Sequence, residues 1–391
     1  MTDPGLGRAG PRPLALHLAT AALTWTGAVL PGGAWMATVK GTHPVDEVLA
    51  LAGAAERRFR QLLDGIAAYQ SHPYRRTLSD PPAVWRAQGI RVLDYGDQDS
   101  FDRPPLVVIP SLINRHYILD LQARQSFMRY LARAGFRPFL VAWEDPGPAA
   151  RFTTIDGYVA VKLDAALAIV RRHTGQKPVI MGYCLGGLLA LALATRRPHD
   201  AAGLVCMATP WDFHADKLCE PEEAAHGLAA IEPLLQASGC LPVDWVQTMF
   251  YALDPFRVIE KFLAFAKCDP ATAEAEAFVA LEDWINDGIS MPAPVARTLI
   301  GEWYGANTPG RGVWTVAGQR VRPEQLAMPA LIVMPERDRI VPPASAQALA
   351  TVIPAADTIT VPRGHIGMLA SRSAPTEVWE PLIAWLRRTC Q

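Results

Sequence analysis

Apolar and polar residues alternate along this chain in blocks that predict strands separated by helices. Short runs of β-branched and other apolar residues occupy residues 90–95, 105–109, 139–143, 178–181, 203–207, 330–334 and 358–361. Segments with a helical pattern occupy residues 124–135, 155–174, 188–194 and 377–388. Strands that alternate with helices indicate an α/β fold, in which helices cover both faces of a mostly parallel sheet.

The alternation stops between residues 211 and 320, which are rich in Trp, Phe and helical patterns. An insertion of this length between two strands of a sheet is typical of a cap over an active site. We therefore expect an N-terminal helical region at 1–84, a core formed by 85–210 and 321–391, and a cap (lid) at 211–320. A Pro-rich passage at 72–82 supports the first boundary.

The N-terminal region contains two different hydrophobic patterns. Residues 14–38 contain no charged residue and follow Arg8 and Arg12. This stretch is compatible with a signal peptide or a membrane anchor, but it is short and interrupted by Pro31, so a helix that packs on the body, a partner or a hydrophobic particle is the preferred interpretation. Residues 45–70 repeat apolar positions at helical spacing and predict an amphipathic helix.

Composition narrows the class of protein. Half of the 391 residues are hydrophobic, as in a globular enzyme, and this length allows one large domain or two. Lys and Arg (37) nearly cancel Asp and Glu (38), so nothing favours a nucleic-acid partner. The six cysteines show no CxxC spacing, which favours a reduced, cytoplasmic setting and no thiol-ligated metal site.

The most informative stretch is the turn GYCLGG at residues 182–187, which follows an apolar strand and precedes an Ala/Leu-rich helix. This layout predicts a nucleophile elbow with Cys184 as the nucleophile. We expect Cys184 to adopt a strained backbone conformation, in which a Cβ atom on Gly182 or Gly186 would collide with the neighbouring chain. The helix that follows would direct N–H groups at the sulfur and favour the thiolate. A buried structural cysteine is the alternative.

A cysteine nucleophile needs a base, and the base needs an orienting acceptor. Asp338 follows the strand that ends at 334, and His365 follows the strand that ends at 361. Each of the two alone could be a structural residue. The order nucleophile, acid, histidine, with each residue just after a strand, is the order of the α/β-hydrolases and predicts a triad of Cys184, Asp338 and His365.

An acyl-transfer site also needs donors for the oxyanion. We expect the backbone N–H of Leu185 and one from the turn at Ser111 and Leu112 to supply them. Among the other histidines, His116 is a further candidate site residue because it lies in the turn that should face the sulfur of Cys184. The residue pattern implies no metal site and no organic cofactor.

Four motifs beyond the elbow give the chain a family resemblance. They are PSLINRHYILDL at 110–121, MATPWDF at 207–213, and the segments around Asp338 and His365. With these motifs the chain resembles the polyhydroxyalkanoate synthases over roughly residues 85–370. The resemblance implies an α/β-hydrolase fold, with Cys184 as the acylated nucleophile, His365 as the base and Asp338 as its orienting partner. The chain departs from the family pattern at Arg339, where the family commonly has His, while 281–288 matches the cap motif only loosely and the first 85 residues match nothing.

Three functions follow as hypotheses. The first is a synthase that polymerises 3-hydroxyacyl-CoA into a polyester and releases CoA, acting in the cytoplasm or at a polyhydroxyalkanoate granule. The resemblance then implies a homodimer or a second synthase subunit. The second is an intracellular polyhydroxyalkanoate depolymerase or thiol esterase with the same triad, because synthase and hydrolase share an acyl-enzyme step. The third is a non-catalytic granule or assembly protein that keeps the fold.

Overall fold

The structure is a computed structural model that describes residues 8, 10–27, 45–87, 89–97, 100, 102–216 and 219–390. The chain divides into two compact units. The first unit joins Met1–Arg76 with Asp244–Asp287, and the second joins Thr77–Val243 with Gly288–Gln391. Residues 28–38 of the apolar N-terminal stretch lie outside the described residues, as do most of residues 1–12.

The second unit is built on an eight-stranded sheet with the order β1-β2-β6-β3-β7-β8-β13-β14. The strands are β1 (Ala83–Ala87), β2 (Ile90–Asp94), β3 (Pro105–Ile109), β6 (Arg137–Trp143), β7 (Val179–Tyr183), β8 (Gly203–Met207), β13 (Ala330–Pro335) and β14 (Asp357–Val361). The pairs from β6 to β14 are parallel, whereas β1–β2 and β2–β6 are antiparallel. The predicted mostly parallel sheet is confirmed, but the edge strand β1 was not predicted from the sequence.

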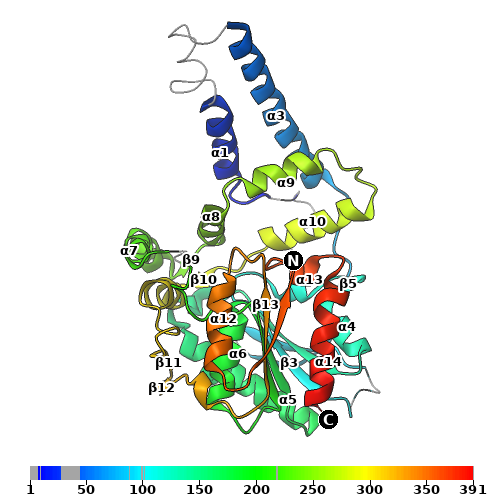
Figure 1. Cartoon of the computed structure of the whole chain (residues 1–391), viewed down its shortest axis with the longest axis vertical. Coiled ribbons are helices and arrows are strands. Elements are labelled where there is room, and N and C mark those ends of the chain that lie inside the picture. Colours follow the sequence, from blue (N-terminus) through cyan, green and yellow to red (C-terminus); the bar gives the residue numbers. More distant parts are fainter. Residues whose placement is uncertain are drawn as a thin grey trace. The chain divides into compact units, whose positions relative to one another are not determined.

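Helices cover both faces of this sheet. Every residue of β3, β6, β7, β8 and β13 is buried, as expected for parallel strands packed on two sides. The principal helices are α4 (Phe127–Arg133), α5 (Asp164–Thr174), α6 (Leu185–Arg196), α12 (Pro343–Val352) and α14 (Glu380–Thr389). In Figure 1, α6 and α12 lie on one side of the strands and α4 and α14 on the other.

Short elements complete the second unit. The helical segments are η1 (His116–Leu119), η2 (Gly147–Phe152), η3 (Gly157–Leu163), α7 (Pro221–Ser238), α11 (Ala293–Arg297), η4 (Thr298–Gly305), η5 (Pro323–Gln325), α13 (Gly367–Ala370) and η6 (Pro375–Trp379). The two-residue and three-residue strands pair as β4 (Asp120–Gln122) with β5 (Gln125–Ser126), β9 (Cys240–Leu241) with β10 (Met291–Pro292), and β11 (Thr315–Val316) with β12 (Gln319–Arg320).

The first unit is helical. It contains α1 (Leu14–Gly27), α3 (Val45–Ser71), most of α8 (Val243–Leu253), α9 (Arg257–Phe265) and α10 (Ala273–Asn286). The amphipathic helix predicted at 45–70 is confirmed as α3. Its apolar face packs Leu62, Ile66 and Tyr69 against Phe262 of α9, within a core that also contains Ala21 of α1. Helices with apolar stripes must bury them against one another, and these do so within one unit.

The grouping of residues differs from the expected domain boundaries. Residues 244–287, which we expected within the cap, pack with the N-terminal helices, whereas 221–243 and 288–320 belong to the unit that contains the sheet. The physical reason is that α9 and α10 carry the buried Phe262, Phe265 and Val279, whose partners are on α3. A cap at residues 211–320 therefore remains a prediction. None of the helices that the structure describes is long and apolar enough to cross a membrane.

Candidate active site

Cys184 lies at the sharp turn between β7 and α6. Its φ of 57° and ψ of −128° place a non-glycine residue in a conformation that costs about 1–3 kcal/mol. The backbone holds this turn on both sides, because Cys184 donates its N–H to Met207 O at 2.9 Å and accepts at its O from the Gly187 N–H at 2.8 Å. The strained conformation expected from the sequence is therefore confirmed.

Two glycines make this turn possible. An added Cβ at Gly182 would lie 2.4 Å from the O of Gly186, and one at Gly186 would lie 2.2 Å from the O of Ile109. Both obstacles are backbone atoms, which cannot rotate away as a side chain can. Gly182 therefore lets the strand contact the start of the helix, and Gly186 lets the helix contact the end of β3, as predicted.

The structure brings Asp338 and His365 together at the same edge of the sheet. Nδ1 of His365 lies 2.7 Å from Oδ2 of Asp338, and both side chains are buried. Oδ1 of Asp338 accepts the N–H groups of Ile340 at 2.8 Å and Val341 at 2.9 Å. A carboxylate held in this way places the proton of the neutral imidazole on Nδ1 and leaves Nε2 free for another partner.

Cys184 acts on His365 through its charge. Burial alone lowers the pKa of His365, but the negative charges of Cys184 and Asp338, together with side-chain hydrogen bonds to both, outweigh burial and raise the pKa to about 10. His365 therefore contacts Asp338 and lies within electrostatic range of Cys184, and a triad of the three residues remains a prediction. Such an arrangement can hold a thiolate beside an imidazolium and move a proton between a substrate and Nε2.

Two tyrosines, Tyr183 and Tyr304, lie near these residues. The hydroxyl of Tyr183 donates to the backbone O of His365 at 3.2 Å, and the two rings are 5.1 Å apart. Tyr304 belongs to η4, and its ring packs edge-on to Phe213 at 5.0 Å. Burial raises the pKa of both tyrosines, and the negative charge of Cys184 raises it further. Sequence reasoning missed Tyr304, since no motif in residues 298–305 marks it.

The candidates for the oxyanion site lie where the sequence placed them. Leu185 is the first residue of α6, and the first N–H groups of a helix have no intrahelical acceptor. Ser111 and Leu112 follow β3, which pairs with β7 so that Ile109 is opposite Gly182. The turn after β3 and the elbow after β7 therefore begin at the same edge of the sheet. Their role in binding an oxyanion remains a prediction.

His116, in contrast, is engaged away from the triad. It begins η1, and its Nε2 lies 3.3 Å from Oδ1 of Asp80. This contact is the largest cause that lowers the pKa of Asp80, with a further contribution from Arg91. Among the described residues, no hydrogen bond or ring contact joins His116 to Cys184, Asp338 or His365. Arg339, which follows the triad carboxylate, is exposed.

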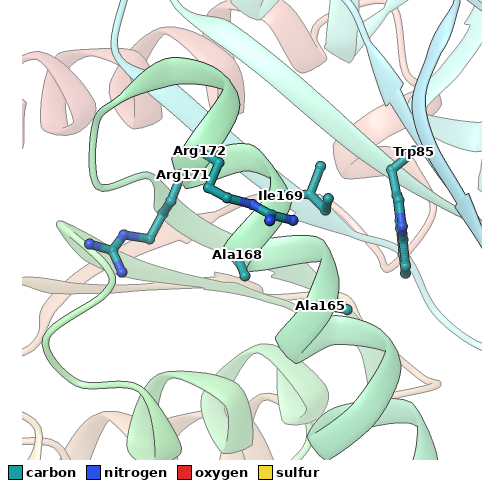
Figure 2. A pocket seen from close by; sticks show the side chains of 6 residues that line it. All are labelled: Trp85, Ala165, Ala168, Ile169, Arg171 and Arg172. Carbon is teal, nitrogen blue, oxygen red and sulfur yellow. The ribbon is translucent and has the colours of Figure 1, made fainter.

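Other features of the second unit do not add to this site. A groove of about 560 Å³ lies between α5 and β1, where Trp85 and Ile169 line it (Figure 2). Arg171, also in its wall, is ion-paired with Asp200. None of the candidate residues lines this groove. Within the part of the chain that the structure describes, no three His, Cys, Asp or Glu side chains are grouped so that they could hold a metal ion.

Comparisons with known proteins agree with the fold and point to a family. The family model described as alpha/beta hydrolase fold matches residues 104–224. The poly(3-hydroxyalkanoate) polymerase subunit PhaC of Haloarcula marismortui is 29% identical over 304 residues, which are 76% of this chain and 63% of that protein. The subunit of the same name from Synechocystis sp. is 28% identical over 308 residues, which are 76% of this chain and 82% of that protein. Among solved structures, the monoacylglycerol lipase of Paleococcus ferrophilus matches 77% of this chain and 99% of its own with a TM-score of 0.49 and 16% identity.

Proposed function

We propose that this chain, a relative of the poly(3-hydroxyalkanoate) polymerases of the α/β-hydrolase superfamily, is an acyltransferase that polymerises 3-hydroxyacyl groups from their CoA thioesters. The observation that carries the proposal is the contact of His365 with Asp338, within electrostatic range of Cys184 at a nucleophile elbow. The names of the relatives supply the substrate class, since they are polymerases of 3-hydroxyalkanoates. The chain spans 63% of the Haloarcula marismortui protein, so the activity of the whole relative is part of the proposal.

The first half-reaction is acylation of Cys184. The thiolate attacks the carbonyl carbon of the acyl-CoA thioester and forms a new thioester bond to Cys184. The bond between the carbonyl carbon and the sulfur of CoA breaks, and the imidazolium of His365 supplies the proton that CoA takes away. The pKa of about 10 keeps His365 protonated for this step near neutral pH.

The second half-reaction transfers the acyl group to a hydroxyl. Nε2 of His365, now neutral, accepts the proton of the hydroxyl group of a second 3-hydroxyacyl unit as its oxygen attacks the acyl-enzyme. An ester bond forms, the thioester bond to Cys184 breaks, and the thiolate and imidazolium are restored. Asp338 holds the imidazole in the required orientation throughout. No oxidant, reductant, metal or organic cofactor is needed, because CoA enters only as part of the substrate.

The proposal extends to the protein assembly and the cellular location of the reaction. The names of the relatives describe subunits, which supports a second synthase subunit or a homodimer as the working form. A polyester product supports work in the cytoplasm at a granule surface. The expected cap would limit the access of water, which otherwise hydrolyses an acyl-enzyme.

Incubation with 3-hydroxybutyryl-CoA tests the proposal. We expect the purified chain to release CoA and form high-mass polyester, whereas Cys184→Ala should do neither. Cys390→Ser is the matched control, since this free cysteine follows α14 and takes no part in the site. CoA release with only free 3-hydroxybutyrate would instead assign the hydrolase, either a depolymerase or a thiol esterase. A wild-type chain whose Cys184 stays unacylated, alone or with a partner subunit, would favour a non-catalytic granule protein.

A further inference from the structure

Ser111 lies just past the end of β3, and Cys184 lies just past the end of the neighbouring strand β7. Strands β3 and β7 are parallel neighbours, and their register places Ile109 opposite Gly182. Ser111 is two residues beyond Ile109, just as Cys184 is two residues beyond Gly182. Both residues therefore follow the carboxyl ends of neighbouring parallel strands, at the same edge of the sheet.

The turn that carries Ser111 is held in place at both ends. On one side, the O atoms of Ile109 and Pro110 lie directly against Gly186, where an added Cβ would be 2.2 Å and 2.5 Å from them. The Nε1 of Trp143 also donates to Pro110 O at 3.2 Å. Beyond Ser111, the N–H of Ile289 donates to the O of Ile113 at 3.0 Å. The position of Ser111 beside the elbow is therefore set by contacts that do not involve its own side chain.

The hydroxyl of Ser111 is buried without a hydrogen-bond partner. The residue is 9% exposed, and its Oγ has no donor or acceptor among the described residues. Buried hydroxyl groups are nearly always hydrogen-bonded, so an exception next to a nucleophile needs an explanation. Among the residues that the structure describes, no base is hydrogen-bonded to this hydroxyl, which leaves it unsuited to act as a nucleophile itself.

We propose that Ser111 Oγ is a catalytic donor of the oxyanion site, which hydrogen-bonds the carbonyl oxygen of the acyl group as Cys184 attacks it. A preorganised donor of this kind stabilises the negative charge that develops on that oxygen in the transition state. The hydroxyl acts in addition to the backbone N–H groups expected from Leu185 and Leu112. It makes only a hydrogen bond, and no covalent bond to Ser111 forms. The identity of the acyl donor as a CoA thioester rests on the proposed function.

The test compares Ser111→Ala with Ser371→Ala. The first variant keeps every backbone N–H group and removes only the hydroxyl. The second removes another buried hydroxyl without a partner, on the residue that ends α13. Rapid-quench measurements follow acylation of Cys184 by 3-hydroxybutyryl-CoA and by 4-nitrophenyl butyrate. Alkylation of Cys184 by iodoacetamide is measured in parallel, because this displacement creates no oxyanion.

We expect Ser111→Ala to acylate about 100-fold more slowly with both substrates, the effect of losing one oxyanion donor. Its alkylation by iodoacetamide should match that of the wild type, and Ser371→Ala should match it in every assay. Equal acylation rates in wild type and Ser111→Ala would overturn the proposal, as would an equal loss of acylation and alkylation, which signals a structural defect.

The two substrates separate this proposal from the proposed function. If the wild type is acylated by the ester but not by the CoA thioester, the polymerase assignment fails, and the comparison on the ester still tests Ser111. Acylation by neither substrate would overturn both.

Discussion

Oδ2 of Asp338 lies 2.7 Å from Nδ1 of His365, while Oδ1 of the same carboxylate accepts two backbone N–H groups. Three contacts therefore hold Asp338, with at least one on each carboxylate oxygen. A carboxylate fixed in this way cannot rotate, and it fixes the imidazole in turn. This relationship makes the two residues a unit whose members should not be exchangeable for neutral analogues.

Asp338→Asn should lower the rate of CoA release strongly while leaving the fold intact. An amide has nearly the same shape, but its NH₂ group cannot accept the Nδ1 proton and favours the wrong tautomer of His365. A loss of about 10⁴-fold in kcat is typical of such a change. Glu336→Gln is the matched control, because this exposed carboxylate lies two residues earlier in the same loop. Steady-state CoA release measures both, and similar rates for the two variants would contradict the orienting role.

The titration of His365 should depend on Cys184. Negative charge on the sulfur favours the imidazolium, so its removal in Cys184→Ala should lower the pKa of His365 from its value of about 10. At pH 8 the wild-type residue should then be protonated, whereas the variant should lose its proton at a lower pH. NMR titration of the imidazole resonances measures the shift. Identical titration curves would show that sulfur and imidazole do not interact.

Gly186→Ala should destabilise the protein because the new Cβ would lie 2.2 Å from the backbone O of Ile109. We expect a loss of about 3 kcal/mol or more in the free energy of unfolding, since the end of β3 must move. Gly227→Ala, within α7, is the control: its Cβ would meet no atom within 4 Å. That change should raise stability by up to about 1 kcal/mol. Urea unfolding followed by circular dichroism distinguishes the two.

Asp120 is the acidic residue near the end of the motif at 110–121. This fully buried carboxylate accepts hydrogen bonds from Ser126 at 2.6 Å, Arg129 at 2.9 Å and Tyr95 at 3.1 Å. Asp120→Asn should cost about 2–3 kcal/mol, because a neutral amide replaces the buried carboxylate that accepts these charge-assisted hydrogen bonds. Tyr95→Phe removes one neutral donor and should cost only about 1 kcal/mol. Chemical denaturation of both variants checks the order, and equal losses would argue against a charge effect.

Much of the fold followed from the sequence alone. The strands of the parallel sheet, the amphipathic helix α3 and the elbow at Cys184 were predicted because strand and helix periods and glycine positions are local properties of a chain. The order of Cys184, Asp338 and His365 could be predicted for a related reason: residues that follow parallel strands meet at one edge of the sheet. The family resemblance rested on the same local motifs.

Only the tertiary structure decided which distant residues meet. It grouped residues 244–287 with the N-terminal helices, paired His116 with Asp80 and left the hydroxyl of Ser111 buried without a partner. It also brought Tyr304 within electrostatic range of Cys184. Each of these outcomes depends on how many weak contacts between far-separated segments pack together at once, and no single residue pattern encodes that sum. The sequence therefore determined the elements and the order of the reactive groups, and the packing of the chain determined what surrounds them.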